Sequence, residues 1–168
     1  MATGRALDVN VSIARIFNTY GPRLRPGDGR VVSNFLVQAL TGQPLTVYGN
    51  GLQTRSLCFV DDLVRGLLCL ADSALTGPVN LGNPDERTVL DLASLVCEVT
   101  GSRSPVVLVP LPTDDPQRRC PDITVARREL DWEPRVTVTD GIRRTAEHFA
   151  RVLAVELPGE NGKDGAAL

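Results

Sequence analysis

The chain has 168 residues, of which 42% are hydrophobic and 23% charged, and its formal net charge is −2. This is enough for one globular core, or for the closing part of a larger fold. A net charge so close to zero gives no long-range attraction to nucleic acid or to an anionic membrane, which argues against both as partners. The many arginines are therefore expected to act locally, on small anions.

The spacing of apolar residues and cysteines indicates which membrane segments, metal sites and cellular compartment to expect. Arg, Asp and Gly interrupt every long apolar stretch, and no cationic segment with an apolar core follows Met1, so the sequence predicts neither a transmembrane helix nor a signal peptide. The four cysteines are scattered, without a Cys-x-x-Cys spacing or clustered histidines, which argues against a metal site and favours reduced thiols. We therefore expect a cytosolic (cytoplasmic) setting and no metal.

The first predicted elements are a strand and a helix joined by a polar loop. Val11–Phe17 is a β-branched run that predicts a buried strand, and the turn at Asn18–Pro22 closes it. A loop rich in Arg, Pro and Gly follows over residues 23–30. Val31–Leu40 has helical periodicity and stops at Gly42. A strand that leads directly into a polar loop is a common place for function.

The middle of the chain alternates in the same way. Leu45–Tyr48 and Arg55–Val60 predict two short strands, and Asp61 or Asp62 is expected to cap a helix that runs through Ala71. Val79–Leu81 predicts a third short strand.

The last part of the chain is mostly helical. Thr88 is expected to cap a helix over Val89–Val99, and Gly101 to end it. Val106–Val109 predicts another strand. Helices are then expected over Asp122–Leu130 and Thr139–Val155. The tail from Pro158 is too polar to order itself.

This alternation predicts an α/β fold, but the strands are short and the segments between them irregular. An autonomous doubly wound domain would show longer parallel strands, each followed by a packing helix. The pattern fits better the last strand of a larger sheet plus a small mixed α/β lobe that closes over a substrate. We therefore expect one domain over residues 1–157, followed by a disordered tail over residues 158–168.

Two sequence features bear on nucleotide chemistry. Gly159, Gly162 and Gly165 have the spacing of a dinucleotide-binding loop, but no strand precedes them and no helix follows, so we do not expect them to bind NAD. Lys163 is the only lysine, and neither Tyr20 nor Tyr48 has a lysine four residues later. A Tyr-x-x-x-Lys catalytic pair is thus absent from this chain.

Five sequence blocks occur in a fixed order. They are Arg15–Pro22 (RIFNTYGP), Pro44–Arg55 (PLTVYGNGLQTR) with Phe59–Leu63 (FVDDL), Asn80–Gly82 (NLG), Asp114–Asp122 (DDPQRRCPD) and Leu130–Pro134 (LDWEP). Each block alone could be an ordinary turn or strand end. The ordered set resembles the extended short-chain dehydrogenases that act on nucleotide sugars, a branch of the NAD-dependent epimerase/dehydratase family, over roughly Val9 to Phe149.

Within that branch, the blocks FNTYGP, DGRVVSNF and DDPQRR resemble most the family that decarboxylates UDP-glucuronate to UDP-xylose. The resemblance implies an NAD-dependent reaction in which the sugar is oxidised at C4, the β-keto acid loses carbon dioxide, and the reduced cofactor returns its hydride. Members of this family are usually homodimers, and they carry a glycine-rich loop and a Tyr-x-x-x-Lys pair upstream of these blocks. The resemblance thus implies that this chain is the back half of an enzyme and is inactive alone.

The resemblance also implies site residues. Arg55 matches an arginine that binds the UDP pyrophosphate, and Arg119 one that faces the hexuronate carboxylate. The less favoured alternative is that Arg118 and Arg119 are solvated surface charges. The other implied substrate-binding residues are Asn18, Val47, Tyr48 and Asn80. The residues implied to contact NAD are Thr19, Arg25 and Arg30. We expect Trp132 to anchor the last helices rather than stack on a ligand, and His148 to take no part in the chemistry.

Two other functions stay open at this point. The chain could belong to a nucleotide-sugar 4,6-dehydratase or epimerase, which would not need a carboxylate-facing Arg119. It could also be an inactive relic, or an interaction module that pairs with a separate nucleotide-binding half through an open sheet edge.

Overall fold

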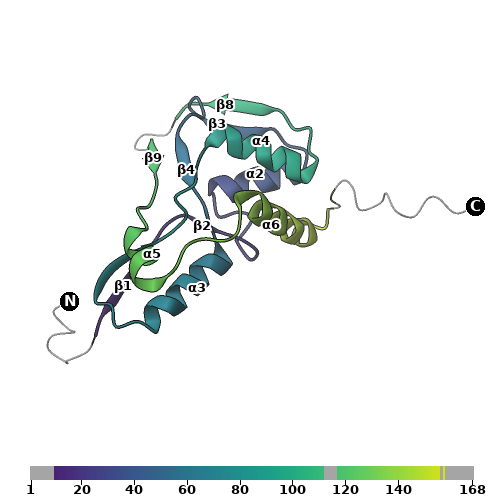
Figure 1. Cartoon of the computed structure of the whole chain (residues 1–168). Coiled ribbons are helices and arrows are strands. Elements are labelled where there is room, and N and C mark those ends of the chain that lie inside the picture. The colour runs from purple at the N-terminus through teal and green to yellow at the C-terminus, as the bar shows by residue number, and fades with distance from the viewer. Residues whose placement is uncertain (1–9, 112–116, 156, 158–168) are drawn as a thin grey trace, which may run out of the picture.

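The structure is a computed structural model that describes residues 10–111, 117–155 and 157. The polar tail and the glycines at 159, 162 and 165 lie outside these residues. In the described part, short strands and helices gather in two regions, one around α2, α4 and α6 and the other around β1, α3 and α5 (Figure 1). No helix among the described residues is both long and apolar enough to cross a membrane.

The first region packs three helices against a small sheet. Its helices are α2 (Val31–Leu40), α4 (Val89–Thr100) and α6 (Val138–Leu153). The parallel strands β3 (Leu45–Tyr48) and β8 (Val106–Val109) complete it. Side chains from all three helices and from β3 form one apolar core, with Leu36 and Phe149 fully buried.

The second region is smaller. The parallel strands β1 (Ser12–Ile16) and β6 (Gly77–Leu81) lie beside α3 (Val60–Ala71) and α5 (Thr124–Leu130). Trp132 is fully buried in its core, packed with side chains of α3, α5 and β6. Its indole Nε1 donates a hydrogen bond of 3.0 Å to the Asp62 carbonyl, so the prediction that Trp132 anchors the last helices is confirmed.

Between the two regions lie very short strands. The pair β2 (Thr19–Tyr20) and β5 (Cys58–Phe59) is parallel. A three-stranded sheet places β4 (Thr54–Ser56) between β7 (Glu86–Thr88) and β9 (Arg118–Arg119), antiparallel to the first and parallel to the second. This sheet carries two of the arginines singled out in the sequence.

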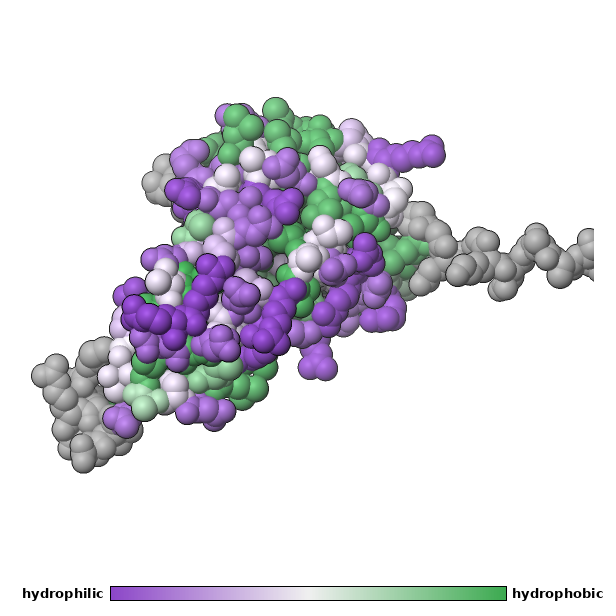
Figure 2. All heavy atoms as spheres, viewed as in Figure 1, coloured by the Kyte–Doolittle hydropathy of each residue, from purple (hydrophilic) through white to green (hydrophobic). Residues whose placement is uncertain are grey.

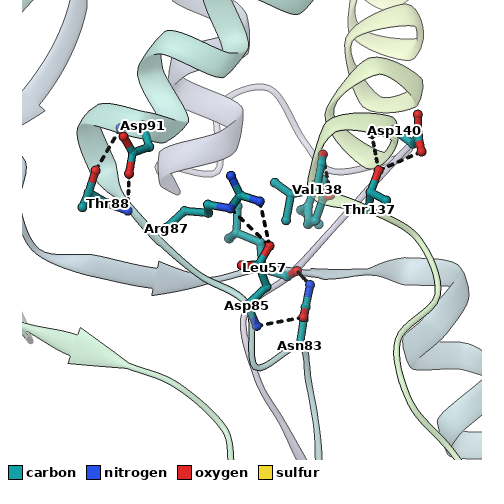
Figure 3. Close-up of polar contacts among 10 residues, drawn as sticks. Leu57, Asn83, Asp85, Arg87, Thr88, Asp91, Thr137, Val138 and Asp140 are labelled. Atoms are coloured by element: carbon teal, nitrogen blue, oxygen red, sulfur yellow. Dashed lines mark hydrogen bonds and ion pairs between the residues drawn. The ribbon is translucent and has the colours of Figure 1, made fainter.

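The sequence signals for the ends of a helix predicted α4 most accurately. The Thr88 side chain accepts a hydrogen bond from the Asp91 amide, and the Asp91 carboxylate accepts one from the Thr88 amide, so the two residues form a capping box (Figure 3). Gly101 ends the helix in the left-handed conformation that glycine adopts without a Cβ penalty. Thr137 caps α6 in a similar way, through the Asp140 amide.

Three sequence expectations were wrong. The first strand is not buried: Ile16 is 57% exposed, because among the described residues β1 pairs only with β6. Arg55–Val60 is not one strand, because β4 and β5 pair with different partners on either side of Leu57. Neither Asp61 nor Asp62 caps α3, since Phe59 is the N-cap and offers no side-chain acceptor.

Asp62 is used differently from the expected cap. Its buried carboxylate accepts hydrogen bonds from the Arg65 guanidinium at 2.7 Å and from the backbone amides of Arg135 and Val136, both at 2.9 Å. These bonds tie the start of α3 to the segment that leads into α6. Asp62 therefore connects the second region to the first.

Candidate functional site

A cavity of about 470 Å³ lies where α2, β3, β4 and β9 meet. It collects side chains that are far apart in the sequence. Six of the nine site residues expected from the resemblance line it: Asn18, Thr19, Arg30, Tyr48, Arg55 and Arg119. The geometry therefore brings together most of the groups that the sequence blocks singled out.

Two arginines form one wall of the cavity. Arg55 lies on the central strand β4 and pairs in register with Arg119 on β9. Residues that pair across neighbouring strands present their side chains on the same face of a sheet, and both arginines line the cavity. The Arg55 Nη1 also donates a hydrogen bond of 2.8 Å to the Thr54 carbonyl. Two adjacent guanidiniums suit a ligand with phosphate or carboxylate groups, which they can bind bidentately.

A third arginine stands at the start of α2. The Arg30 Nε bonds the Asp28 carboxylate at 2.5 Å, and its Nη1 donates to the Thr19 carbonyl at 3.2 Å. Asp28 also accepts hydrogen bonds from the Arg30 amide and from Ser33. Burial alone would raise the pKa of Asp28, but the hydrogen bonds from Ser33 and Arg30 hold it below its usual value. The carboxylate therefore stays charged and fixes the Arg30 side chain.

Apolar and aromatic side chains form the other walls of the cavity. Phe35, Leu57 and Val89 supply buried apolar surface, and Tyr48 presents a partly exposed ring. A pocket with apolar walls and a few polar groups is the usual form of a small-molecule site.

Tyr20 lines the cavity but is not placed to act as a base. Its hydroxyl donates to the Val138 carbonyl at 3.2 Å, and its ring meets Phe59 edge-on with 5.6 Å between centroids. Burial raises the pKa of Tyr20 far above 10. A Cβ at Gly141 would lie 2.0 Å from the Tyr20 hydroxyl, so α6 needs glycine there. Tyr20 holds α6 beside the cavity, and supplies no proton acceptor.

Three expected site residues lie elsewhere. Val47 is fully buried in the first core and does not line the cavity. Arg25 lies exposed in the loop before α2. Asn80 donates from its Nδ2 to the Asp122 carbonyl at 2.8 Å. For these three residues, a role in binding stays a prediction that the cavity does not support. His148 lies half-buried on α6 and is not among the lining residues either.

Sequence reasoning missed three polar lining residues, Asn34, Thr46 and Gln53. Gln53 is buried and donates from its Nε2 to the Tyr48 carbonyl at 2.8 Å, which holds the turn between β3 and β4. All three stand inside sequence blocks that were already recognised, so their position in those blocks was the available signal. Among the described residues no cluster of three His, Cys, Asp or Glu side chains could hold a metal.

The chain has recognisable relatives. Residues 2–82 match the model of the NAD dependent epimerase/dehydratase family. The chain is 52% identical over 145 residues to UDP-glucuronic acid decarboxylase 1 of Danio rerio, covering 86% of this chain and 35% of that protein. It is 47% identical over 156 residues to UDP-glucuronic acid decarboxylase 1 of Arabidopsis thaliana, covering 93% of this chain and 36% of the relative. The chain thus spans about a third of the length of these relatives.

Solved structures share the fold. A UDP-glucose 4-epimerase of Thermotoga maritima, solved with UDP-glucose, superposes with a TM-score of 0.85 at 32% identity, over 89% of this chain and 49% of that one. A UDP-glucuronic acid 4-epimerase of Bacillus cereus, in complex with UDP-glucuronic acid and NAD, superposes with a TM-score of 0.83 at 25% identity, over 90% and 48%. The fold expected from the sequence, the closing portion of a Rossmann-like short-chain dehydrogenase, is confirmed. The chain is therefore similar to the NAD dependent epimerase/dehydratase family over residues 2–82, and to UDP-glucuronic acid decarboxylases over most of its own length.

Proposed function

We propose that this chain supplies the nucleotide-sugar-binding part of an enzyme that decarboxylates UDP-glucuronate to UDP-xylose with NAD. The observation that carries the proposal is the pairing of Arg55 with Arg119 on one wall of the cavity. One guanidinium suits the pyrophosphate of a UDP-sugar, and the other suits the carboxylate that distinguishes a hexuronate from a hexose.

Each wall then has a role. Arg55 binds the pyrophosphate, and the amide of Asn18 donates to phosphate or sugar oxygens. Tyr48 and the buried apolar side chains enclose the nucleoside. Arg119 holds the carboxylate that is later lost as carbon dioxide, so it orients the sugar for oxidation at C4.

Only one side of the cavity is assigned to contact with the cofactor. Thr19 of β2 and Arg30, the N-cap of α2, line that side and are the residues of this chain that suit contact with NAD. Bound NAD supplies the hydride acceptor, and that chemistry is the cofactor's own. The chain holds no Tyr-x-x-x-Lys pair, and Tyr20 is engaged with Val138. We therefore expect this polypeptide to bind substrate but not to turn it over alone. The homodimer and the cytosolic setting stay predictions.

Calorimetric titration of the chain tests the proposal and separates it from the epimerase or dehydratase alternative. We expect UDP-glucuronate to bind about tenfold to a hundredfold more tightly than UDP-glucose, since a charge-assisted bidentate contact to Arg119 contributes roughly 1.5–3 kcal/mol. Equal affinity for the two sugars would favour the alternative. No binding of any UDP-sugar, or detectable UDP-xylose from the pure chain with NAD, would contradict the proposal.

A further inference from the structure

The strand that carries Arg119 has little to hold it. β9 is two residues long, and both of its side chains are exposed. It adds to β4 in parallel, and the Thr54 amide donates to the Gln117 carbonyl at 3.0 Å just before it. A strand this short gains little from its own backbone pairing. Side-chain contacts add to that pairing, and just after β9 the Cys120 thiol donates to the Pro84 carbonyl at 3.5 Å.

The charged contact of β9 is an ion pair on the face of the sheet opposite the two cavity arginines. The Arg118 Nε lies 2.9 and 3.0 Å from the two Glu86 carboxylate oxygens, and its Nη2 lies 2.5 Å from one of them. The Thr54 hydroxyl donates to the same carboxylate at 2.7 Å. Glu86, Thr54 and Arg118 belong to β7, β4 and β9. One carboxylate therefore joins all three strands, and we call this set of three residues the β9 clamp.

Strand alternation connects the clamp to the cavity. Successive residues of a strand point to opposite faces, so Arg119 faces away from Glu86 when Arg118 faces it. The register agrees, since Arg118 pairs with Thr54 and Arg119 pairs with Arg55. The clamp residues share one face, and the two cavity arginines share the other. Holding Arg118 on Glu86 thus places Arg119 against the cavity.

We propose that the β9 clamp is a positioning device that sets the preference of the site for a sugar bearing a carboxylate. This inference rests on the proposed function, because it assigns the carboxylate contact to Arg119. Arg55 lies on the central strand and is also held by β7, so the pyrophosphate contact does not depend on β9. Breaking the clamp should therefore weaken binding of the sugar acid and spare binding of the nucleotide.

The experiment measures, on the full chain, the affinity for UDP-glucuronate and for UDP by calorimetry, together with amide exchange at Thr54 by NMR. Arg118→Gln should lower the affinity for UDP-glucuronate about threefold to fivefold, in the range of an exposed but bidentate pair. Its affinity for UDP should change less than twofold, and Thr54 exchange should accelerate. Arg118→Lys, which keeps the cation but not the bidentate geometry, should restore only part of the preference. Glu86→Gln should reproduce the Arg118→Gln result.

Arg128→Gln is the matched control. It removes the same charge from another arginine–carboxylate pair, with 69% of its side chain exposed against 72% for Arg118, but on α5. It should behave as wild type. The proposal is overturned if Arg118→Gln changes neither the preference for UDP-glucuronate nor the exchange of the Thr54 amide. It is also overturned if Arg118→Gln lowers the affinity for UDP as much as the affinity for UDP-glucuronate. If the wild-type chain binds no UDP-sugar, the proposed function fails. In that case the rate of amide exchange at Thr54 still shows whether the β9 clamp holds β9 against β4.

Discussion

The two regions of the molecule bury their apolar side chains to different extents. The first region has the larger apolar core, between three helices and β3, but leaves Val107 and Leu108 of β8 exposed. The second region has a smaller core and leaves β1 exposed, together with Val64 and Leu68 of α3. Figure 2 shows apolar surface along the lower edge of the molecule, where the α3 side lies, and also over the β3–β8 end. The cavity residues come from the first region and from the short strands beside it. The cavity thus borders the larger of the two apolar cores.

The largest expected effect lies in the core of the second region. Trp132→Ala should lower the free energy of unfolding by about 3–5 kcal/mol, because it removes a fully buried aromatic ring and its hydrogen bond. Urea denaturation followed by circular dichroism measures this loss, with Trp132→Phe as the milder variant. A loss below about 1 kcal/mol would mean that the second region contributes little to global stability.

The second-largest expected effect is a loss of ligand affinity at the cavity beside the first region. Arg55→Gln should weaken binding of UDP and of UDP-glucuronate alike, by about tenfold to a hundredfold, since a hydrogen bond to a charged group contributes roughly 1.5–3 kcal/mol. Calorimetry with both ligands checks this. An effect confined to UDP-glucuronate would reverse the roles assigned to Arg55 and Arg119.

Asp62 tests whether the two regions unfold together. Asp62→Asn should cost about 1–3 kcal/mol, because it disturbs a buried acceptor shared by Arg65 and two backbone amides. The matched variant Asp61→Asn breaks an exposed pair with Arg144 and should cost at most about 1 kcal/mol. Two separate unfolding transitions in Asp62→Asn, with one in wild type, would identify Asp62 as the link. Equal costs for both variants would contradict this role.

The smallest effect is a pH dependence of the β9 clamp. The side-chain hydrogen bonds from Arg118 and Thr54 lower the pKa of Glu86 from 4.5 to about 2. Because the folded pKa is depressed, the stabilisation is fully present above about pH 4.5 and is lost as the pH falls through 2. NMR titration of the Glu86 carboxyl carbon measures this value. In Arg118→Gln the pKa should rise toward 4.5, and an unchanged value would mean that Arg118 is not its partner.

Local signals predicted the local structure. The cap at Thr88 and the glycine at 101 predicted α4 nearly to the residue, because both act within one turn of the helix. β7 and β9 gave no such signal, since their polar residues form strands only by pairing with β4. The exposure of β1 could not be read from its β-branched residues, because burial depends on the neighbours that a strand finds.

In the candidate site, too, features that depend on residues far apart in the sequence could not be predicted from local signals. Nothing in the spacing of Arg55 and Arg119, which are 64 residues apart, brings them together. Their convergence was expected only from the family resemblance. That same resemblance also proposed Val47 and Asn80, which the structure places in a core and on the Asp122 carbonyl. Sequence blocks therefore indicated which segments meet, but not which side chain of each segment faces the cavity.

In the proposed function, Arg55 and Arg119 bind one nucleotide-sugar acid between them. NMR observation of the arginine Nε–H groups during titration with UDP-glucuronate tests it most directly. We expect the signals of Arg55 and Arg119 to shift together and saturate at the same ligand concentration, while the signal of Arg128 stays in place. Saturation of only one of the two, or a shift of Arg128 equal to theirs, would contradict the account.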